Sequence, residues 1–425
     1  MRVCVALLFV IFLSEPVRAV PNTFFGNGDG PIVVIPAQPR FNADLTEEFF
    51  QIEQWKENKF SGPWDEKSAI GDRKLKSMSA MPVVFGEIPM AVRVFSDGNG
   101  VSEVVIDFLD AGLFFSYQAE SEDSPEQREA GRERRKEFSK YFRSLSRSIE
   151  DRLEEGCGRG ITRSIGKSEM LRTEFRDFQW DGFVIRFVER ENHSVSLHIF
   201  REGRVPDGLV DRSTVSLDYR DRKERYSERV AAQENGDVIV NGLPMMTQGN
   251  TPFCGIHSLA MAGHYFGLRM NPEELAAAAG FKNNGSAKGS DIVELHRAVA
   301  NELEMNCAIS PGFKLSRVRN SIEEGRPVIV WRRVTAEREA AHSSYAAARK
   351  VNEDLLIPKL SNDELDSLPG KGDRGAPSHA SIITGINSDK GEVIYTEPWG
   401  ESTRDRRMTA EEMEATVYAV FYFKP

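Results

Sequence analysis

Cys254 is the residue whose type and position most favour covalent chemistry. The segment around it runs Thr251, Pro252, Phe253, Cys254, Gly255. Thr251 can cap a helix and Pro252 suits a first turn, so we expect Cys254 in the first turn of a helix. Free N–H groups and the positive dipole end at that position can lower a cysteine pKa from about 8.5 to roughly 3.5–7.5. The pattern therefore predicts a nucleophilic thiolate.

A proton acceptor for this thiol is expected near the C-terminal end of the sequence. Residues 378–386 form an apolar run typical of a buried strand, with His379 near its start. A turn at residues 387–391 and a return strand at 392–396 follow, and the return strand ends at Glu397. Such a hairpin brings Glu397 within one or two rows of His379. A carboxylate there can orient the imidazole and stabilise its charged form.

Alternatives remain for two of these roles. His257 lies one helical turn after Cys254 and could act as the base, and Asn387 could orient His379 in place of Glu397. Four other histidines are expected to be ordinary helix, turn or strand residues: His193, His198, His264 and His296. No cluster has the spacing of a zinc site, because Cys254 and His257 lack a second close pair. We therefore expect no metal and no cofactor.

In combination, these segments resemble the papain-like cysteine peptidases. The resemblance is greatest to the peptidases that process bacteriocins after double-glycine leaders, and to their stand-alone relatives. Gln248 lies six residues before Cys254, which matches the spacing between the oxyanion-hole glutamine and the nucleophile in that family. An acidic residue before proline after the histidine hairpin also matches, although this sequence has Glu397 before Pro398 where the family has Asp. The resemblance covers residues 240–425, interrupted by an insertion.

The resemblance implies a helical half that carries the nucleophile, an antiparallel sheet half that carries the base, and a cleft between them. The implied activity is hydrolysis of a peptide or protein substrate through a thioester on Cys254. The side-chain amide of Gln248 and the backbone N–H of Cys254 would stabilise the oxyanion. Two other functions are compatible with the same residues: a papain-like binding module without turnover, and transglutaminase-like acyl transfer.

The C-terminal domain is expected to span residues 237–425. Asn271 and Pro272 signal the start of a helix that ends at Gly280, and apolar spacing from Leu315 to Ile322 predicts another. Residues 328–331 are typical of a buried strand. Residues 334–377 are weakly patterned, and we interpret them as an insertion between two strands that forms a lid or a self-inhibitory segment.

The N-terminal half predicts a separate α+β domain at residues 45–230, so the fold class of the whole chain is α+β. Apolar residues recur at spacings of three and four in a helix expected from Ser124 to Leu153. Strand pairs are expected at 90–95 with 101–109 and at 183–188 with 195–200. A strongly charged stretch at residues 204–237 marks the boundary. No group of residues in this domain suggests chemistry, so its role stays open.

The first residues are typical of an export signal. Arg2 precedes an apolar run at residues 3–13, and residues 17–19 have the small-residue pattern of a cleavage site. We expect a signal peptide at residues 1–19, a loose leader at 20–44, and a periplasmic or extracellular protein with no membrane-spanning segment after cleavage. Removal of Cys4 leaves three cysteines, hence at least one free thiol.

The net charge of −10 argues against a nucleic-acid partner, because no basic surplus exists to neutralise phosphates. The sequence leaves the oligomeric state open.

Overall fold

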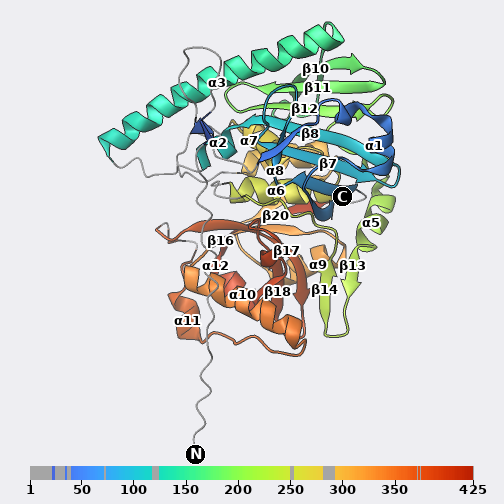
Figure 1. The fold of residues 1–425 in the computed structure, drawn as a ribbon. Helices are drawn as coiled ribbons and strands as arrows, with labels where there is room; N and C mark the ends of the chain where they lie inside the picture. The colour runs from blue at the N-terminus through green and yellow to red at the C-terminus, as the bar shows by residue number, and fades with distance from the viewer. Residues whose placement is uncertain are drawn as a thin grey trace, which may run out of the picture.

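The computed structural model describes residues 22–23, 34–35, 40–70, 73–116, 124–248, 253–280, 292–370, 372–373 and 375–424. The expected signal peptide at 1–19 and most of the expected leader at 20–44 lie outside these ranges. The structure is 36% helical and 32% strand, which confirms the α+β class. Two sheets lie one above the other in Figure 1, and helices α6 (Cys254–Tyr265), α7 (Pro272–Ala278) and α8 (Val293–Glu302) lie between them.

The N-terminal half is built on an antiparallel sheet with the strand order β4-β5-β7-β8-β12-β11-β10-β9. Both expected hairpins are present, because Asp97 pairs with Gly100 and Arg190 pairs with Ser194 across short turns. The strands are β4 (Trp64–Ile70), β5 (Arg73–Met78), β7 (Ala91–Asp97), β8 (Gly100–Asp110), β9 (Ile161–Ile165), β10 (Thr173–Trp180), β11 (Phe183–Arg190) and β12 (Ser194–Arg201).

One face of this sheet carries the N-terminal core. The long helix α3 (Pro125–Cys157) lies across it, and the apolar stripe expected from the sequence is buried there. The stripe consists of Phe138, Phe142, Leu145, Ile149 and Leu153. The short helix α1 (Ile52–Glu57) adds the fully buried Trp55. Smaller elements complete this half: β1 (Asn22–Thr23), β2 (Val34–Ile35), β3 (Arg40–Asp44), η1 (Glu48–Phe50), β6 (Met81–Val83) and α2 (Ala111–Ser116).

The C-terminal half contains a second antiparallel sheet with the order β13-β14-β17-β16-β20-β15, and β18 joins β17 to β19. Its strands are β13 (Val230–Ala232), β14 (Asp237–Val240), β15 (Asn306–Ser310), β16 (Val328–Arg333), β17 (Ser378–Asn387), β18 (Glu392–Thr396), β19 (Arg406–Thr409) and β20 (Val417–Lys424). The long β17 lies between β14 and β16, so both of its edges are paired along part of its length.

Helix α6 is the centre of the C-terminal core. Every residue from 255 to 265 is buried, so the helix is covered on all sides rather than along one stripe. Helix α7 starts at Pro272, as the sequence predicts, and a capping box between Asn271 and Glu274 satisfies the first backbone groups of the helix. The other helices of this half are α9 (Leu315–Glu323), α10 (Ala336–Val351), α11 (Asn362–Ser367), η2 (Glu401–Thr403) and α12 (Ala410–Thr416).

The second face of the N-terminal sheet packs on the C-terminal half through charged side chains. Arg93 of β7 lies 3.8 Å from Glu273 of α7, and Arg269 lies 3.8 Å from Glu103 of β8. Two helices of the boundary region, α4 (Arg212–Val215) and α5 (Tyr219–Ser227), belong with the C-terminal half, because Tyr226 lies in its apolar core. The two halves therefore form one packed body.

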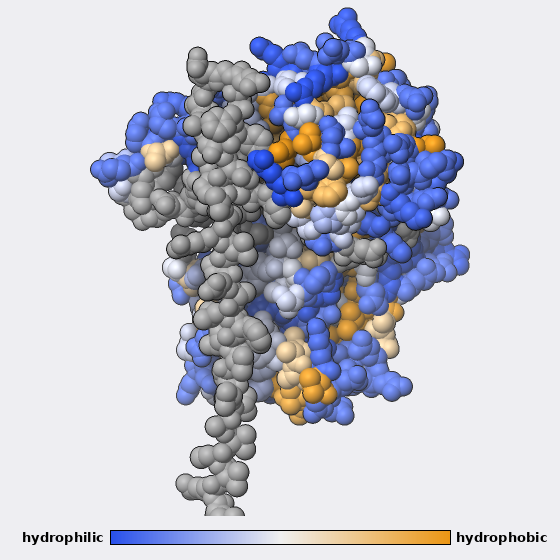
Figure 2. Space-filling view, viewed as in Figure 1, coloured by the Kyte–Doolittle hydropathy of each residue, from blue (hydrophilic) through white to orange (hydrophobic). Residues whose placement is uncertain are grey.

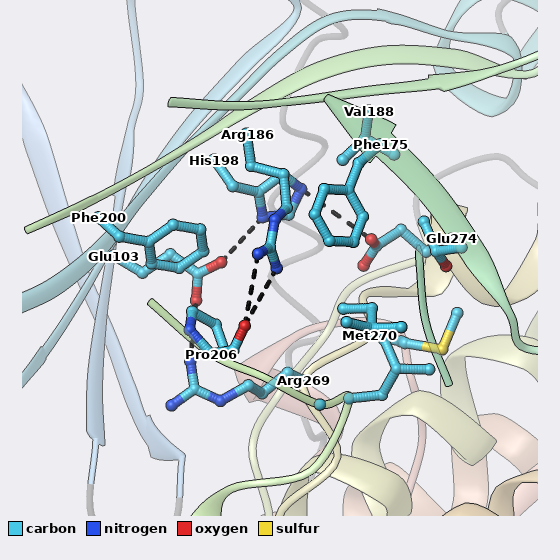
Figure 3. Close-up of a pocket in the computed structure, with 14 residues that line it drawn as sticks. Glu103, Phe175, Arg186, Val188, His198, Phe200, Pro206, Arg269, Met270 and Glu274 are labelled. Carbon is cyan, nitrogen blue, oxygen red and sulfur yellow. Dashed lines mark hydrogen bonds and ion pairs between the residues drawn. The ribbon is translucent and has the colours of Figure 1, made fainter. Parts of the chain in front are cut away.

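A cavity of about 40 Å³ lies within this interface, and Figure 3 shows the side chains that line it. His198 of β12 points toward two acids. Its Nδ1 lies 2.8 Å from Glu103, and its Nε2 lies 4.0 Å from Glu274. Burial lowers the pKa of His198, but these acids outweigh burial and raise it. The sequence treats His198 as an ordinary strand residue, and the structure places it in a buried charge cluster between the two halves.

Hydrophilic residues dominate the face seen in Figure 2, with hydrophobic residues in small separate groups. Among the described residues, no helix combines the length and the apolar character that crossing a bilayer requires.

The backbones of α5 and of the turn after α9 approach closely, and this contact gives a test of the fold. Gly325 follows α9 with a φ of +73°, and a Cβ there would collide with the carbonyl oxygen of Tyr226. Gly391, in the turn before β18, has a φ of +64° with open space around it. Gly391→Ala should therefore cost only the conformational strain of about 1–2 kcal/mol.

Gly325→Ala adds a collision to that strain, so we expect a clearly lower thermal midpoint than for Gly391→Ala. Differential scanning calorimetry of the two variants checks this. Equal midpoints would show that α5 and α9 are not held at this distance.

Candidate active site

The structure brings three of the four residues named from the sequence, Cys254, His379 and Glu397, into one buried cluster. Cys254 is the first residue of α6, His379 is the second residue of β17, and Glu397 directly follows β18. The N-cap of α6 is Phe253, which makes no side-chain cap. Thr251 and Pro252, expected to start this helix, lie outside the described residues.

Strand register explains why the histidine and the acid meet. Ile382 of β17 pairs with Thr396 of β18, so Glu397 lies next to the β17 residues just before Ile382. His379 and Ser381 are two apart on β17 and share one face of the strand. Both hydrogen bond to Glu397: His379 Nε2 lies 2.6 Å from Oε2, and Ser381 donates to Oε1 at 2.8 Å.

The thiol of Cys254 hydrogen bonds to the side chain of His379 and to the backbone of Ala380. Because His379 Nε2 is engaged by Glu397, its Nδ1 is the nitrogen that is left for the thiol. Ser258, one turn along α6, donates to the carbonyl of Ala380 at 3.3 Å. This second contact fixes α6 against β17 close to the site.

Burial and charge act in opposite directions on this pair. Burial raises the pKa of the Cys254 thiol, but the hydrogen bond and charge of His379 outweigh burial and lower it. Burial lowers the pKa of His379, but Glu397 and Cys254 outweigh burial and raise it to about 9. Both shifts favour a thiolate next to an imidazolium, which is the nucleophilic form of a cysteine.

Glu397 is completely buried and has a second set of partners beneath the histidine. Arg332 of β16, which pairs with His379 across the strands, donates to Glu397 Oε1 at 2.6 Å and to Ser381 at 3.0 Å. Burial raises the pKa of Glu397, but the charges of His379 and Arg332 outweigh burial and lower it. The carboxylate therefore stays ionised, with one oxygen on the histidine and the other on Arg332.

Helix α10 supplies the counter-charge for Arg332. Glu339 accepts from Arg332 at 2.7 and 3.1 Å and from Arg406 at 2.6 Å. Arg406 also lies 3.8 Å from Glu397. The weakly patterned stretch at 334–377 thus contributes Glu339, which neutralises the arginine that bonds to Glu397.

The sequence reasoning did not single out Arg332, Glu339 or Trp399 as site residues. One signal was present, since Arg332 is a charge at the end of the apolar run 328–331, and buried charges are rarely found without a partner. The ring of Trp399 lies 4.4 Å from that of His379. Trp399 therefore covers one side of the imidazole.

Gln248 lies beside the segment that follows Glu397, because its backbone N–H donates to the carbonyl of Pro398 at 2.8 Å. Residues 249–252, between Gln248 and the helix, lie outside the described ranges.

The two open alternatives are placed differently. His257 is buried with its Nδ1 3.1 Å from the carbonyl of Met246, and Asn387 donates to Asn235 and Asp237 at the far end of β17. His257 is therefore bonded to a backbone carbonyl, and Asn387 is bonded to residues other than His379.

Two further observations concern the cysteines and the possible metal ligands among the described residues. Cys157, Cys254 and Cys307 are all free thiols. In the same ranges, no group of three or more His, Cys, Asp or Glu side chains is arranged to hold a metal ion.

The first test of this site is selective alkylation. Burial raises the pKa of Cys157 to about 11, whereas the pKa of Cys254 is lowered. At pH 7 iodoacetamide should label Cys254 at least about tenfold faster than Cys157, because only the thiolate reacts. Peptide mapping after short exposures measures both rates, with the partly exposed Cys307 as an internal reference. Equal labelling of all three thiols would contradict a thiolate at Cys254.

The second test is the pH profile of hydrolysis. The reactive pair exists above the pKa of Cys254 and below that of His379, so activity should fall as the pH rises through about 9. Glu397→Gln removes a charge that raises the pKa of His379. We expect this alkaline limb to move to lower pH and kcat to fall at least about tenfold. Glu401→Gln, an exposed acid on the same loop, is the control. An unmoved alkaline limb in Glu397→Gln would show that Glu397 does not act on His379.

Comparison with known proteins agrees with a cysteine peptidase. Residues 240–424 match the sequence profile of a family described as the Peptidase_C39 like family. The solved structure of a protein from Bacillus anthracis, described as a C39-like peptidase, is 19% identical with a TM-score of 0.29, covering 44% of this chain and 98% of that one. No curated protein matches the chain. The family match supports a cysteine peptidase in the C-terminal half.

Proposed function

We propose that this protein is an exported cysteine peptidase that hydrolyses peptide bonds through Cys254, His379 and Glu397. One observation carries the proposal: a helix-terminal thiol hydrogen bonds to a histidine whose other nitrogen lies 2.6 Å from a buried carboxylate. A nucleophile, a base and a residue that orients the base, in hydrogen-bond reach of one another, are the parts that acyl transfer requires.

The proposed reaction has two halves. The Cys254 thiolate attacks the carbonyl carbon of a peptide bond, and the imidazolium of His379 gives its proton to the leaving amine as the C–N bond breaks. A water molecule, deprotonated by His379, then attacks the thioester, and the acid product leaves with the thiol restored. Glu397 keeps the imidazole oriented and stabilises its positive charge in both halves.

The oxyanion is proposed to be stabilised by the side-chain amide of Gln248 and the backbone N–H of Cys254. The position of Cys254 at the first residue of α6 supports the second of these donors, because N–H groups at a helix start have no partner within the helix. Loss of one such donor typically costs about 2.7–4 kcal/mol in the barrier.

Export is part of the proposal and rests on the sequence pattern of residues 1–19. A relationship to the stand-alone relatives of the double-glycine leader peptidases stays a prediction. The Glu in place of Asp at position 397 does not weaken the proposal, because the longer side chain reaches His379 with one oxygen and Arg332 with the other.

The purified protein tests the proposal with unfolded β-casein as substrate. We expect cleavage by the wild type and a loss of at least about a thousandfold in Cys254→Ala and His379→Ala, because members of a catalytic unit fail together. Cys157→Ala is the matched control and should cleave at the wild-type rate. Mass spectrometry of the products measures each rate.

Two outcomes would replace the proposal. Fast labelling of Cys254 by iodoacetamide without any cleavage would favour a binding module. Conjugation of an added amine to casein, in place of hydrolysis, would favour acyl transfer of the transglutaminase type.

A further inference from the structure

An open groove of about 780 Å³ begins at Trp399. Apart from Trp399, its lining comes from the connection between β16 and β17, with residues of 334–339 on one side and of 367–377 on the other. This volume lies within the range of roughly 300–1,000 Å³ that ligand sites usually have. The connection therefore builds a concavity large enough for several residues of an extended peptide.

The groove is continuous with the candidate active site. Trp399 is shared by both, since its ring lies 4.4 Å from the ring of His379. Pro377, at the other edge of the groove, lies two residues before His379 in the chain. The groove therefore adjoins the histidine side of the site.

The position of the groove beside His379 indicates which part of a substrate would occupy it. In acyl transfer the histidine protonates the leaving amine, so the leaving segment must lie beside the imidazole. The residues after the cleaved bond belong to that segment. A groove that includes Trp399, the ring in contact with His379, is therefore placed to take the residues on the C-terminal side of the cleaved bond.

The lining favours apolar side chains. Apolar residues supply most of the wall: Val334, Ala336, Pro369, Ala376, Pro377 and Trp399. The two acids in the lining are already engaged. Glu339 holds Arg332 and Arg406, and Asp373 accepts from the backbone N–H groups of Gly375 and Ala376. Bonds to backbone N–H groups leave the charge of the exposed Asp373 in place, so the apolar wall is the part of the lining that supports a preference.

The groove is preformed, because α10 is fixed to the core along its length. His342 is buried and bonds to Glu412 at 2.7 Å and to Tyr395 at 2.8 Å. One helical turn earlier, Arg338 pairs with the same Glu412 at 2.8 Å. A rigid wall binds an extended chain at a lower entropic cost than a mobile one. Whether other residues of 334–377 also close over the site stays a prediction.

We propose that the connection at 334–377 forms a specificity groove for the residues that follow the cleaved bond, with preference for apolar side chains. This inference rests on the proposed peptidase function and extends it to substrate selection.

The test uses Ala336→Trp in the full-length protein. Ala336 is exposed at the start of α10 and lines the groove, so an indole there fills the groove without entering the core. Ala347→Trp is the matched control, because Ala347 is also exposed on α10 but does not line the groove. The substrate is unfolded β-casein, and mass spectrometry maps each cleaved bond and its rate.

We expect wild type and Ala347→Trp to cut casein at equal rates, with apolar residues enriched at the positions after the cut. Ala336→Trp should cut at least about tenfold more slowly and lose this enrichment, while iodoacetamide labels its Cys254 at the wild-type rate. The same rate and the same cut sites in both variants would overturn the groove.

A binding measurement separates failure of the groove from failure of the peptidase. Tryptic peptides of casein should slow the alkylation of Cys254 in wild type and Ala347→Trp, and not in Ala336→Trp. Protection without any cleavage would support the proposed groove and contradict the proposed peptidase function. Equal protection in all three proteins, or protection in none of them, would overturn the groove.

Discussion

The ionised carboxylate of Glu397 is the group on which the geometry of the C-terminal half depends. A buried charge is tolerated only when partners replace its water, since the effective penalty is several kcal/mol for each ion. Its partners come from β16 and β17, as Arg332, Ser381 and His379. Removing one partner of a buried pair typically costs about 3–5 kcal/mol. The orientation of the histidine is thus enforced by the stability of the sheet.

The same carboxylate explains the role of α10. Arg332 is almost completely buried and needs more negative charge than Glu397 alone supplies, and Glu339 provides it. From the thiol inward, the charges alternate: Cys254 negative, His379 positive, Glu397 negative, Arg332 positive, Glu339 negative and Arg406 positive. The array is neutral as a whole, which is how a thiolate and an imidazolium can both persist away from bulk water.

Much of this arrangement follows from local patterns in the sequence. Residues only a few positions apart encode three of these features, and the structure contains all of them: helix α3, the start of α7 and the β17–β18 hairpin. The hairpin alone is enough to place Glu397 beside His379. Arg332 and Glu339 could not be assigned, because their pairing depends on how β16 packs beside β17 and how α10 returns over the sheet. Spacing along a chain does not report such long-range contacts.

The interface between the halves was beyond prediction for the same reason. Alternation in β8 and β12 shows that the two faces of the N-terminal sheet differ, yet not what covers the second face. Glu103 and His198 look like solvated strand residues in the sequence. They are buried because Arg269 and Glu274 of the C-terminal half meet them there.

This interface also has a consequence for the order of events as the chain emerges. The last strand of the N-terminal sheet ends at Arg201, before any residue of α6 or α7. Because domains tend to form as units from the N-terminus onward, the charged face of this sheet exists before the helices that cover it. Glu273 and Glu274 thus meet partners already in place, Arg93 and His198, and α7 docks on a sheet face that has already formed.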